Sequence, residues 1–202
     1  KANSQLQLLQ SKQFSQHGLF PELAFYECHS CHRPMSRSRW PVEPASAMVS
    51  PGSVRLDDAA LVVLTSVLDI LANESAGQLR VATKLLHAAS LKDKSSIVES
   101  AILIQGILSG VSAIIIEKKY TATQKKMLRK KLLEDASKGV FRDYSSAEQV
   151  FYAVETLSID LNDESKHEKK LDKLFLAINS EEEYYPDQFT VIAQLFFHDL
   201  SE

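Results

Sequence analysis

Cys28 and Cys31, the only two cysteines of the chain, stand three positions apart, and His32 follows the second one directly. This C-x-x-C-H spacing suits covalent attachment of haem, because two thiols can add to the two vinyl groups on one edge of a porphyrin. The imidazole of the next residue can then reach the iron from one face. The spacing therefore predicts Cys28 and Cys31 as haem-attachment residues and His32 as the proximal iron ligand.

The surrounding segment, from Tyr26 to Pro34, resembles the attachment segment of c-type cytochromes. The resemblance covers less than a tenth of the chain. It implies one haem c, thioether bonds at Cys28 and Cys31, and an iron ligand at His32. It further implies maturation in the periplasm or after another form of export, an inference that rests on the motif alone. A monohaem cytochrome would transfer electrons, with a redox partner protein, or sense a small ligand.

Two other chemistries use the same cysteine spacing. A zinc site would need two further ligands, for instance His29 or His32 together with a remote histidine. A disulfide between Cys28 and Cys31 would be either redox-active or structural. The alternative function is therefore a helical binding or scaffold protein in which the cysteine pair holds zinc or forms a disulfide.

Met48 is the favoured candidate for the distal iron ligand. It follows His32 by sixteen residues, and a loop of that length can cross to the opposite face of a porphyrin. Met35 follows too closely to leave the proximal side. His87 and His198 are further candidates, but each lies on an apolar stretch and is expected to be a partly buried structural histidine. The alternatives for Met48 are packing beneath its loop, or an open coordination position.

The remaining charged residues indicate no enzyme class. The chain has no G-x-x-x-x-G-K, G-x-S-x-G or H-E-x-x-H motif, so an electron carrier or binding protein is expected rather than an enzyme. A net charge of −3 predicts no nucleic-acid partner. The basic segment 118–131 is expected to be a solvated helix face, with a docking patch as the alternative. His17 and His167 stand among polar residues and are expected to be solvated.

Helices must position these groups, because the apolar residues after Asp57 recur every three or four positions. No alternating strand bounded by hairpin turns is evident. We therefore predict an all-α, bundle-like domain of six to eight helices, with a Pro/Ser/Arg-rich loop after the N-terminal segment. Residues 1–55 would carry the motif and this loop, residues 56–202 would form the helical domain, and the two would fold as one cooperative unit.

Several helix boundaries can be predicted. Thr121 with Gln124 forms a capping box before a basic helix that Gly139 would end. Ser145 with Glu148 indicates a second capping box. Two further helices are expected over residues 164–179 and 186–200.

Residues 97–116 are apolar almost all round, which predicts the central helix of the fold. Polar and glycine residues interrupt this stretch, so we interpret it as a buried core helix and expect no transmembrane segment.

Overall fold

The computed structural model describes residues 2–11, 25–26, 55–116 and 119–200. Within these ranges the chain forms helices and no β-strand, which confirms the all-α prediction. The eight described helices are α1 (Ala2–Gln10), α2 (Ala59–Leu71), α3 (Asn73–Ser90), α4 (Lys94–Ile116), α5 (Ala122–Ser137), α6 (Tyr144–Asp160), α7 (Glu164–Ala177) and α8 (Pro186–Asp199).

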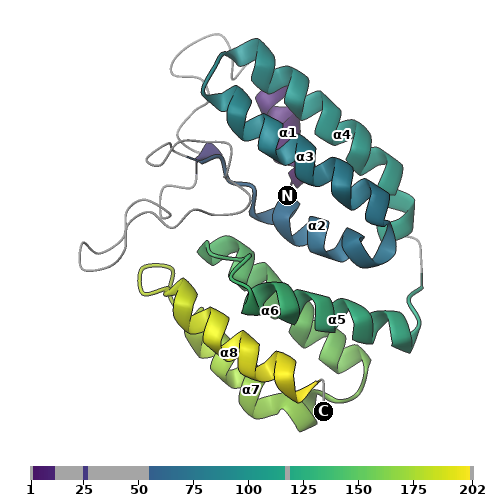
Figure 1. Cartoon of the computed structure of the whole chain (residues 1–202), viewed down its shortest axis with the longest axis vertical. Helices are drawn as coiled ribbons and strands as arrows, with labels where there is room; N and C mark the ends of the chain where they lie inside the picture. The colour runs from purple at the N-terminus through teal and green to yellow at the C-terminus, as the bar shows by residue number, and fades with distance from the viewer. Residues whose placement is uncertain (1, 12–24, 27–54, 117–118, 201–202) are drawn as a thin grey trace.

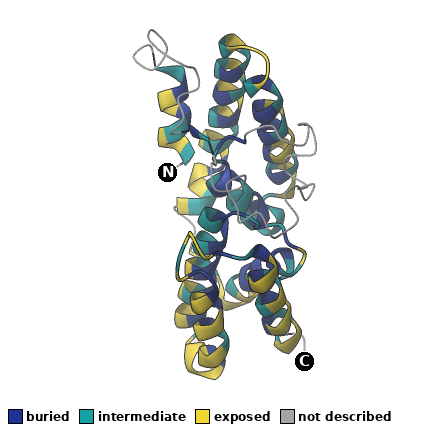
Figure 2. Cartoon of the chain, turned by 90° about the vertical axis from the view of Figure 1, so that its left-hand side faces the viewer, coloured by how far each residue is buried: buried dark blue, intermediate teal, exposed yellow. Residues whose placement is uncertain are grey.

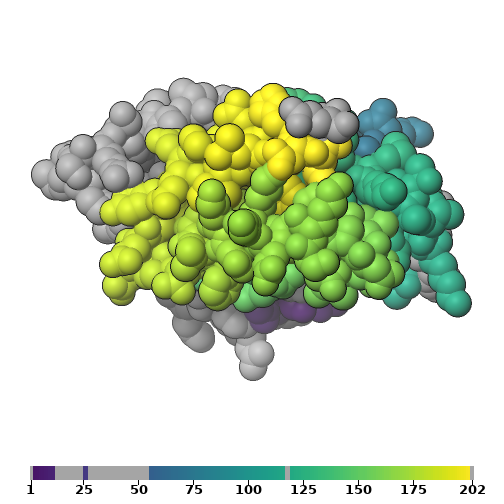
Figure 3. Space-filling view, turned by 90° about the horizontal axis from the view of Figure 1, so that it is seen from below, coloured from purple at the N-terminus to yellow at the C-terminus, as the bar shows by residue number. Residues whose placement is uncertain are grey.

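The helices form two units of four, stacked one above the other (Figure 1). One hydrophobic core belongs to α1–α4, here called the N-terminal unit, and a second belongs to α5–α8, the C-terminal unit. In each unit the second helix packs on the third, the third on the fourth, and the first on the fourth. The surfaces of α7 and α8 close the end of the molecule furthest from α4 (Figure 3).

Helix α2 joins the two units. Leu61 and Leu68 are buried in the N-terminal core, whereas Val62, Val63 and Val67 pack against the C-terminal core. The helix accordingly contacts α3 on one side and α5 and α6 on the other. Buried residues therefore continue through the middle of the molecule, where the units meet (Figure 2). The central helix of this fold is α2.

The prediction that residues 97–116 form the central helix of the fold is wrong, because these residues belong to α4, which lies at the edge of the N-terminal unit. It packs only on α1 and α3 among the stronger helix pairs, and 17% of its most apolar window is buried. Ile97, Ala101, Ile104 and Val111 face the core, while Ile102 stays 54% exposed. An apolar pattern all round the helix gave no indication of how many neighbours would cover it.

Among the described helices, α4 alone is long and apolar enough to cross a membrane, by length and composition. One such helix is weak evidence, because core helices of soluble proteins pass the same test. The absence of a transmembrane segment stays a prediction.

The predicted helix ends are partly correct. Thr121 and Gln124 form the expected capping box of α5, and Gly139 follows that helix with a left-handed φ of 70°. The expected box at Ser145 and Glu148 is wrong. Helix α6 begins at Tyr144, because the Asp143 carboxylate accepts a hydrogen bond from the Ser146 amide at 2.7 Å.

Candidate functional site

The predicted haem-binding residues Cys28, Cys31, His32 and Met48 lie outside the described residues. The described segments that come before and after these residues in the sequence, 25–26 and 55–57, contact each other. Tyr26 and Leu56 form an antiparallel bridge, and the Asp57 amide donates to the Phe25 carbonyl at 2.7 Å. Residues 26 and 56 are thus held side by side just before α2, and residue 26 stands two positions before Cys28. This paired backbone of Phe25, Tyr26, Leu56 and Asp57 is called the anchor below.

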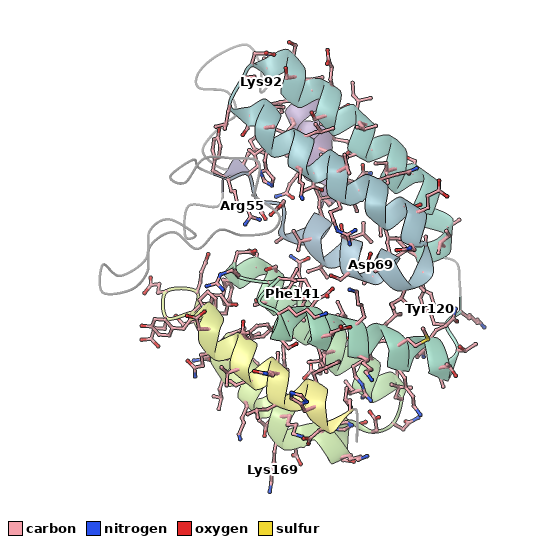
Figure 4. All side chains as sticks on the ribbon, viewed as in Figure 1. Arg55, Asp69, Lys92, Tyr120, Phe141 and Lys169 are labelled. Atoms are coloured by element: carbon pink, nitrogen blue, oxygen red, sulfur yellow. The ribbon has the colours of Figure 1, made fainter. Side chains whose placement is uncertain are left out.

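A buried polar cluster formed by Arg55, Asp58 and His87 lies next to this anchor. Figure 4 labels Arg55 at this position. Arg55 Nη2 donates to Asp58 Oδ1, and His87 Nε2 lies 2.8 Å from Asp58 Oδ2. The side chains of Asp58 and His87 are 2% and 1% exposed, so the contacts are shielded from water. The cluster joins the segment entering α2 to the last turn of α3.

The charges around the cluster favour an ionised Asp58. Burial by itself would raise the pKa of this carboxyl, but Arg55 and His87 outweigh burial and lower the pKa. Asp143, at the start of α6, shows the opposite shift. Burial raises its pKa, and the negative charge of Asp58 adds to that effect against the hydrogen bonds from Ser146. The negative charge of Asp58 in the N-terminal unit thus acts on Asp143 in the C-terminal unit.

His87 is a buried structural histidine, as the sequence predicted. Its Nδ1 atom has no hydrogen-bond partner among the described residues. A histidine held by a carboxylate through one nitrogen can offer the other to a metal. However, the described residues contain no group of three histidine, cysteine, aspartate or glutamate side chains that could hold a metal ion.

The cavity next to the anchor is small. Phe25, Leu56, Asp58, Leu61 and Leu86 contribute to its wall, and its volume is about 20 Å³. This volume admits about one water molecule and no porphyrin. This cavity therefore cannot enclose a haem.

Two other histidine predictions are wrong. His167 is 5% exposed and packs on Phe196, with ring centroids 5.2 Å apart. Burial lowers the pKa of this imidazole, and the charge of Arg129 acts in the same direction. His198, expected to be partly buried, is exposed on α8. His17 lies outside the described part of the chain.

The basic segment 118–131 is not a uniformly solvated face. Arg129 is 3% exposed and donates from both terminal nitrogens to Asp163, at 2.5 and 2.9 Å. Lys131 lies between Asp69 and Asp135, at 3.2 and 2.9 Å from their carboxylate oxygens. Its position connects α5 to α2. These cations stabilise contacts between helices, which a count of charges along the sequence could not reveal.

A second cavity among the described residues is larger than the one next to the anchor and was not predicted from the sequence. It measures about 210 Å³ and lies between α2, α3 and α5, where the units meet. Thr65, Ser66 and Asp69 line it from α2. A signal for this site was present in the sequence, because these polar residues interrupt an otherwise apolar helix on a single face.

Comparisons with known proteins add no relative. No protein-family model matches the chain, and the searches of curated proteins and of solved structures found no match either. Inference about function therefore depends on the motif and on the geometry described above.

Proposed function

We propose that this chain is a monohaem c-type cytochrome, with haem c attached at Cys28 and Cys31 and His32 as the proximal iron ligand. The observation that carries the proposal is the C-x-x-C-H motif itself. When bound, haem would supply one-electron exchange or binding of a small ligand at the iron. The chain's own residues would fix the haem edge through two thioether bonds and hold the imidazole of His32 at the iron. Export and a redox partner protein belong to the same proposal.

The anchor at Phe25, Tyr26 and Leu56 supports this role by fixing the chain two residues before Cys28. Its apolar side chains would lie near the attached group, while the ion pair of Arg55 with Asp58 holds the neighbouring backbone. Because the adjoining cavity is only about 20 Å³, a haem attached here would lie outside the two packed cores. We retain Met48 as the proposed distal ligand. The buried position of His87 makes that residue the weaker candidate.

The filled cores favour a second candidate. Both four-helix units close around their own apolar side chains, so the described helices need no cofactor to complete a core. In this candidate the chain is a helical binding or scaffold protein, and Cys28 and Cys31 hold zinc or form a disulfide. The two candidates differ in the covalent chemistry of the same two thiols.

The deciding experiment is production of the full chain, with an export leader, in a host that matures c-type cytochromes. We expect a mass increase of one haem that survives denaturation, and a haem-stained band on a denaturing gel. Both signals should vanish in the Cys28→Ser, Cys31→Ser double variant and persist in the matched control Ser30→Ala. Met48→Ala should alter the iron absorption spectrum without removing the haem.

A wild-type chain that leaves this host without haem overturns the cytochrome proposal. Bound zinc or a disulfide that disappears in the double cysteine variant would then support the second candidate. Free thiols with neither haem nor zinc would contradict both.

A further inference from the structure

The cavity between α2, α3 and α5 carries an inference that is independent of the haem motif. We propose that it binds a small hydroxylated organic acid bearing a single negative charge. Its volume of about 210 Å³ provides room for a small organic molecule, since about 10–15 Å³ by the same measure is enough to hold one water molecule. Pockets between packed units are a frequent position for ligand sites.

The charges lining the cavity select a monoanion. Arg80, Lys84 and Lys131 supply three positive charges, and Asp69 and Asp135 supply two negative ones, which leaves one positive charge in excess. A dianion would meet more repulsion from the two carboxylates than the excess charge offsets. A neutral ligand would leave the excess positive charge of the cavity unpaired.

Lys84 is the side chain expected to bind the ligand's carboxylate. It makes no hydrogen bond or ion pair with any other described residue, whereas Lys131 is held between Asp69 and Asp135. Arg80 uses one terminal nitrogen, Nη2, for both oxygens of Asp69, at 2.9 and 3.0 Å. Lys84 and Arg80 lie four positions apart on α3, so both line the same side of the cavity.

The buried wall of the cavity recognises hydroxyl groups. The Thr65 and Thr83 hydroxyls each donate to the helix carbonyl four residues earlier, at 2.7 and 2.9 Å. Both therefore keep lone pairs that can accept a hydrogen bond from a ligand. Asp135, which is 6% exposed, receives Lys131 through Oδ1 and can accept a ligand hydroxyl through its other oxygen. Val62 and Val140 provide apolar contact for the carbon skeleton.

The test is a titration of the isotopically labelled full chain, followed by two-dimensional NMR of its backbone amides. Gluconate is the probe, because it carries one carboxylate and several hydroxyls. A ligand of this size that binds with ordinary efficiency has a dissociation constant on the order of 1 mM. We therefore expect saturable shifts below about 20 mM, at amides of α2, α3 and α5. Hexanoate, which lacks the hydroxyls, and inorganic phosphate should bind several-fold more weakly.

Two variants separate specific binding from general attraction of anions. Lys84→Gln should weaken gluconate binding about tenfold, because it removes a charged hydrogen-bond donor. Thr83→Val should weaken gluconate binding and leave hexanoate binding unchanged. The matched control is Lys169→Gln, which changes an exposed lysine of α7 far from the cavity (Figure 4).

The proposal is overturned if gluconate gives no saturable shift, or if Lys84→Gln binds it as well as the wild type does. Equal binding of phosphate and gluconate would also overturn it, because the cavity would then attract anions without recognising hydroxyls. Any loss of folding in a variant would be visible in the same spectra, and the probe series on the wild type decides the question without the variants.

Discussion

The N-terminal and C-terminal units share three helix pairings, second on third, third on fourth and first on fourth, yet they use the aspartate at the start of the second helix differently. In the C-terminal unit, Asp143 accepts a hydrogen bond from the Ser146 amide and caps α6. In the N-terminal unit, Asp58 precedes α2 but makes no capping hydrogen bond, and its two oxygens bind Arg55 and His87. The same residue type at the same helix position thus stabilises a helix end in one unit and a tertiary contact in the other.

The units differ also in the match between their helix lengths. Helix α8 has 14 residues and packs on α5, which has 16. Helix α4 has 23 residues, or about 34 Å, and packs on the nine residues of α1, or about 14 Å. Ile102, Leu103 and Ile116 of α4 are exposed. Val191 and Leu195 of the better-matched α8 are also exposed, at 55% and 56%, so the length of a neighbouring helix does not by itself decide how much of an apolar helix is buried.

The largest expected effect comes from replacing Asp58 by Asn. This change removes the negative charge that pairs with buried Arg55, and we expect a loss of about 3–5 kcal/mol in the free energy of unfolding. Chemical denaturation followed by circular dichroism measures it. The control is Asp187→Asn, at a side chain that is 84% exposed beside Arg142, which should stay within about 0.5 kcal/mol of wild type. A loss below 1 kcal/mol at Asp58 would show that the cluster is dispensable.

Two glycines, one in each unit, should respond to alanine with opposite signs. Gly139 has a φ of 70°, so Gly139→Ala forces a left-handed conformation on a residue with a Cβ and should cost about 1–2 kcal/mol. A Cβ at Gly110 of α4 would meet no described atom within 4 Å, so Gly110→Ala should stabilise the chain by about 0.5–1 kcal/mol. Thermal unfolding of both variants checks the signs. Destabilisation by Gly110→Ala would mean that this face of α4 is covered.

The smallest effect is expected at Asp143. Burial raises its pKa in the folded state above the ordinary value of 3.8, so the ionised carboxylate lowers stability at neutral pH. Asn caps helices about as well as Asp, and Asp143→Asn should therefore stabilise the chain at pH 7 by less than about 1 kcal/mol. As the pH falls through the raised pKa toward 3.8, the wild-type carboxyl becomes protonated and this gain should disappear.

Asp58 provides the matched comparison for that pH profile. Because its folded-state pKa is lowered, its contacts with Arg55 and His87 stabilise the wild type above pH 3.8, and this stability is lost as the pH falls through the folded-state pKa. The deficit of Asp58→Asn should therefore be full at neutral pH and shrink in acid. Denaturation curves between pH 3 and 7 measure both variants. If Asp58→Asn and Asp143→Asn changed the free energy of unfolding in the same direction at neutral pH, the proposed difference between the two aspartates would be contradicted.

Local patterns predicted the helices well. The three- and four-residue apolar period gave the class of fold, and the ends of α7 and α8 agree with the expected ranges 164–179 and 186–200 to within two residues. The capping box at Thr121 was correct because its hydrogen bonds link residues only three positions apart. The box at Ser145 failed because Asp143, two residues earlier, formed the competing cap.

The sequence by itself determined the all-α class, several helix boundaries and the C-x-x-C-H motif, since each depends on residues close together in the chain. Tertiary structure alone decided that α2 is central and α4 peripheral, that Asp58 pairs with Arg55 and His87, and that a cavity forms between α2, α3 and α5. Burial and pairing depend on which distant segments share a surface. The periodicity of the sequence shows whether a helix face is apolar or polar. Only the tertiary structure shows which other residues pack against that face.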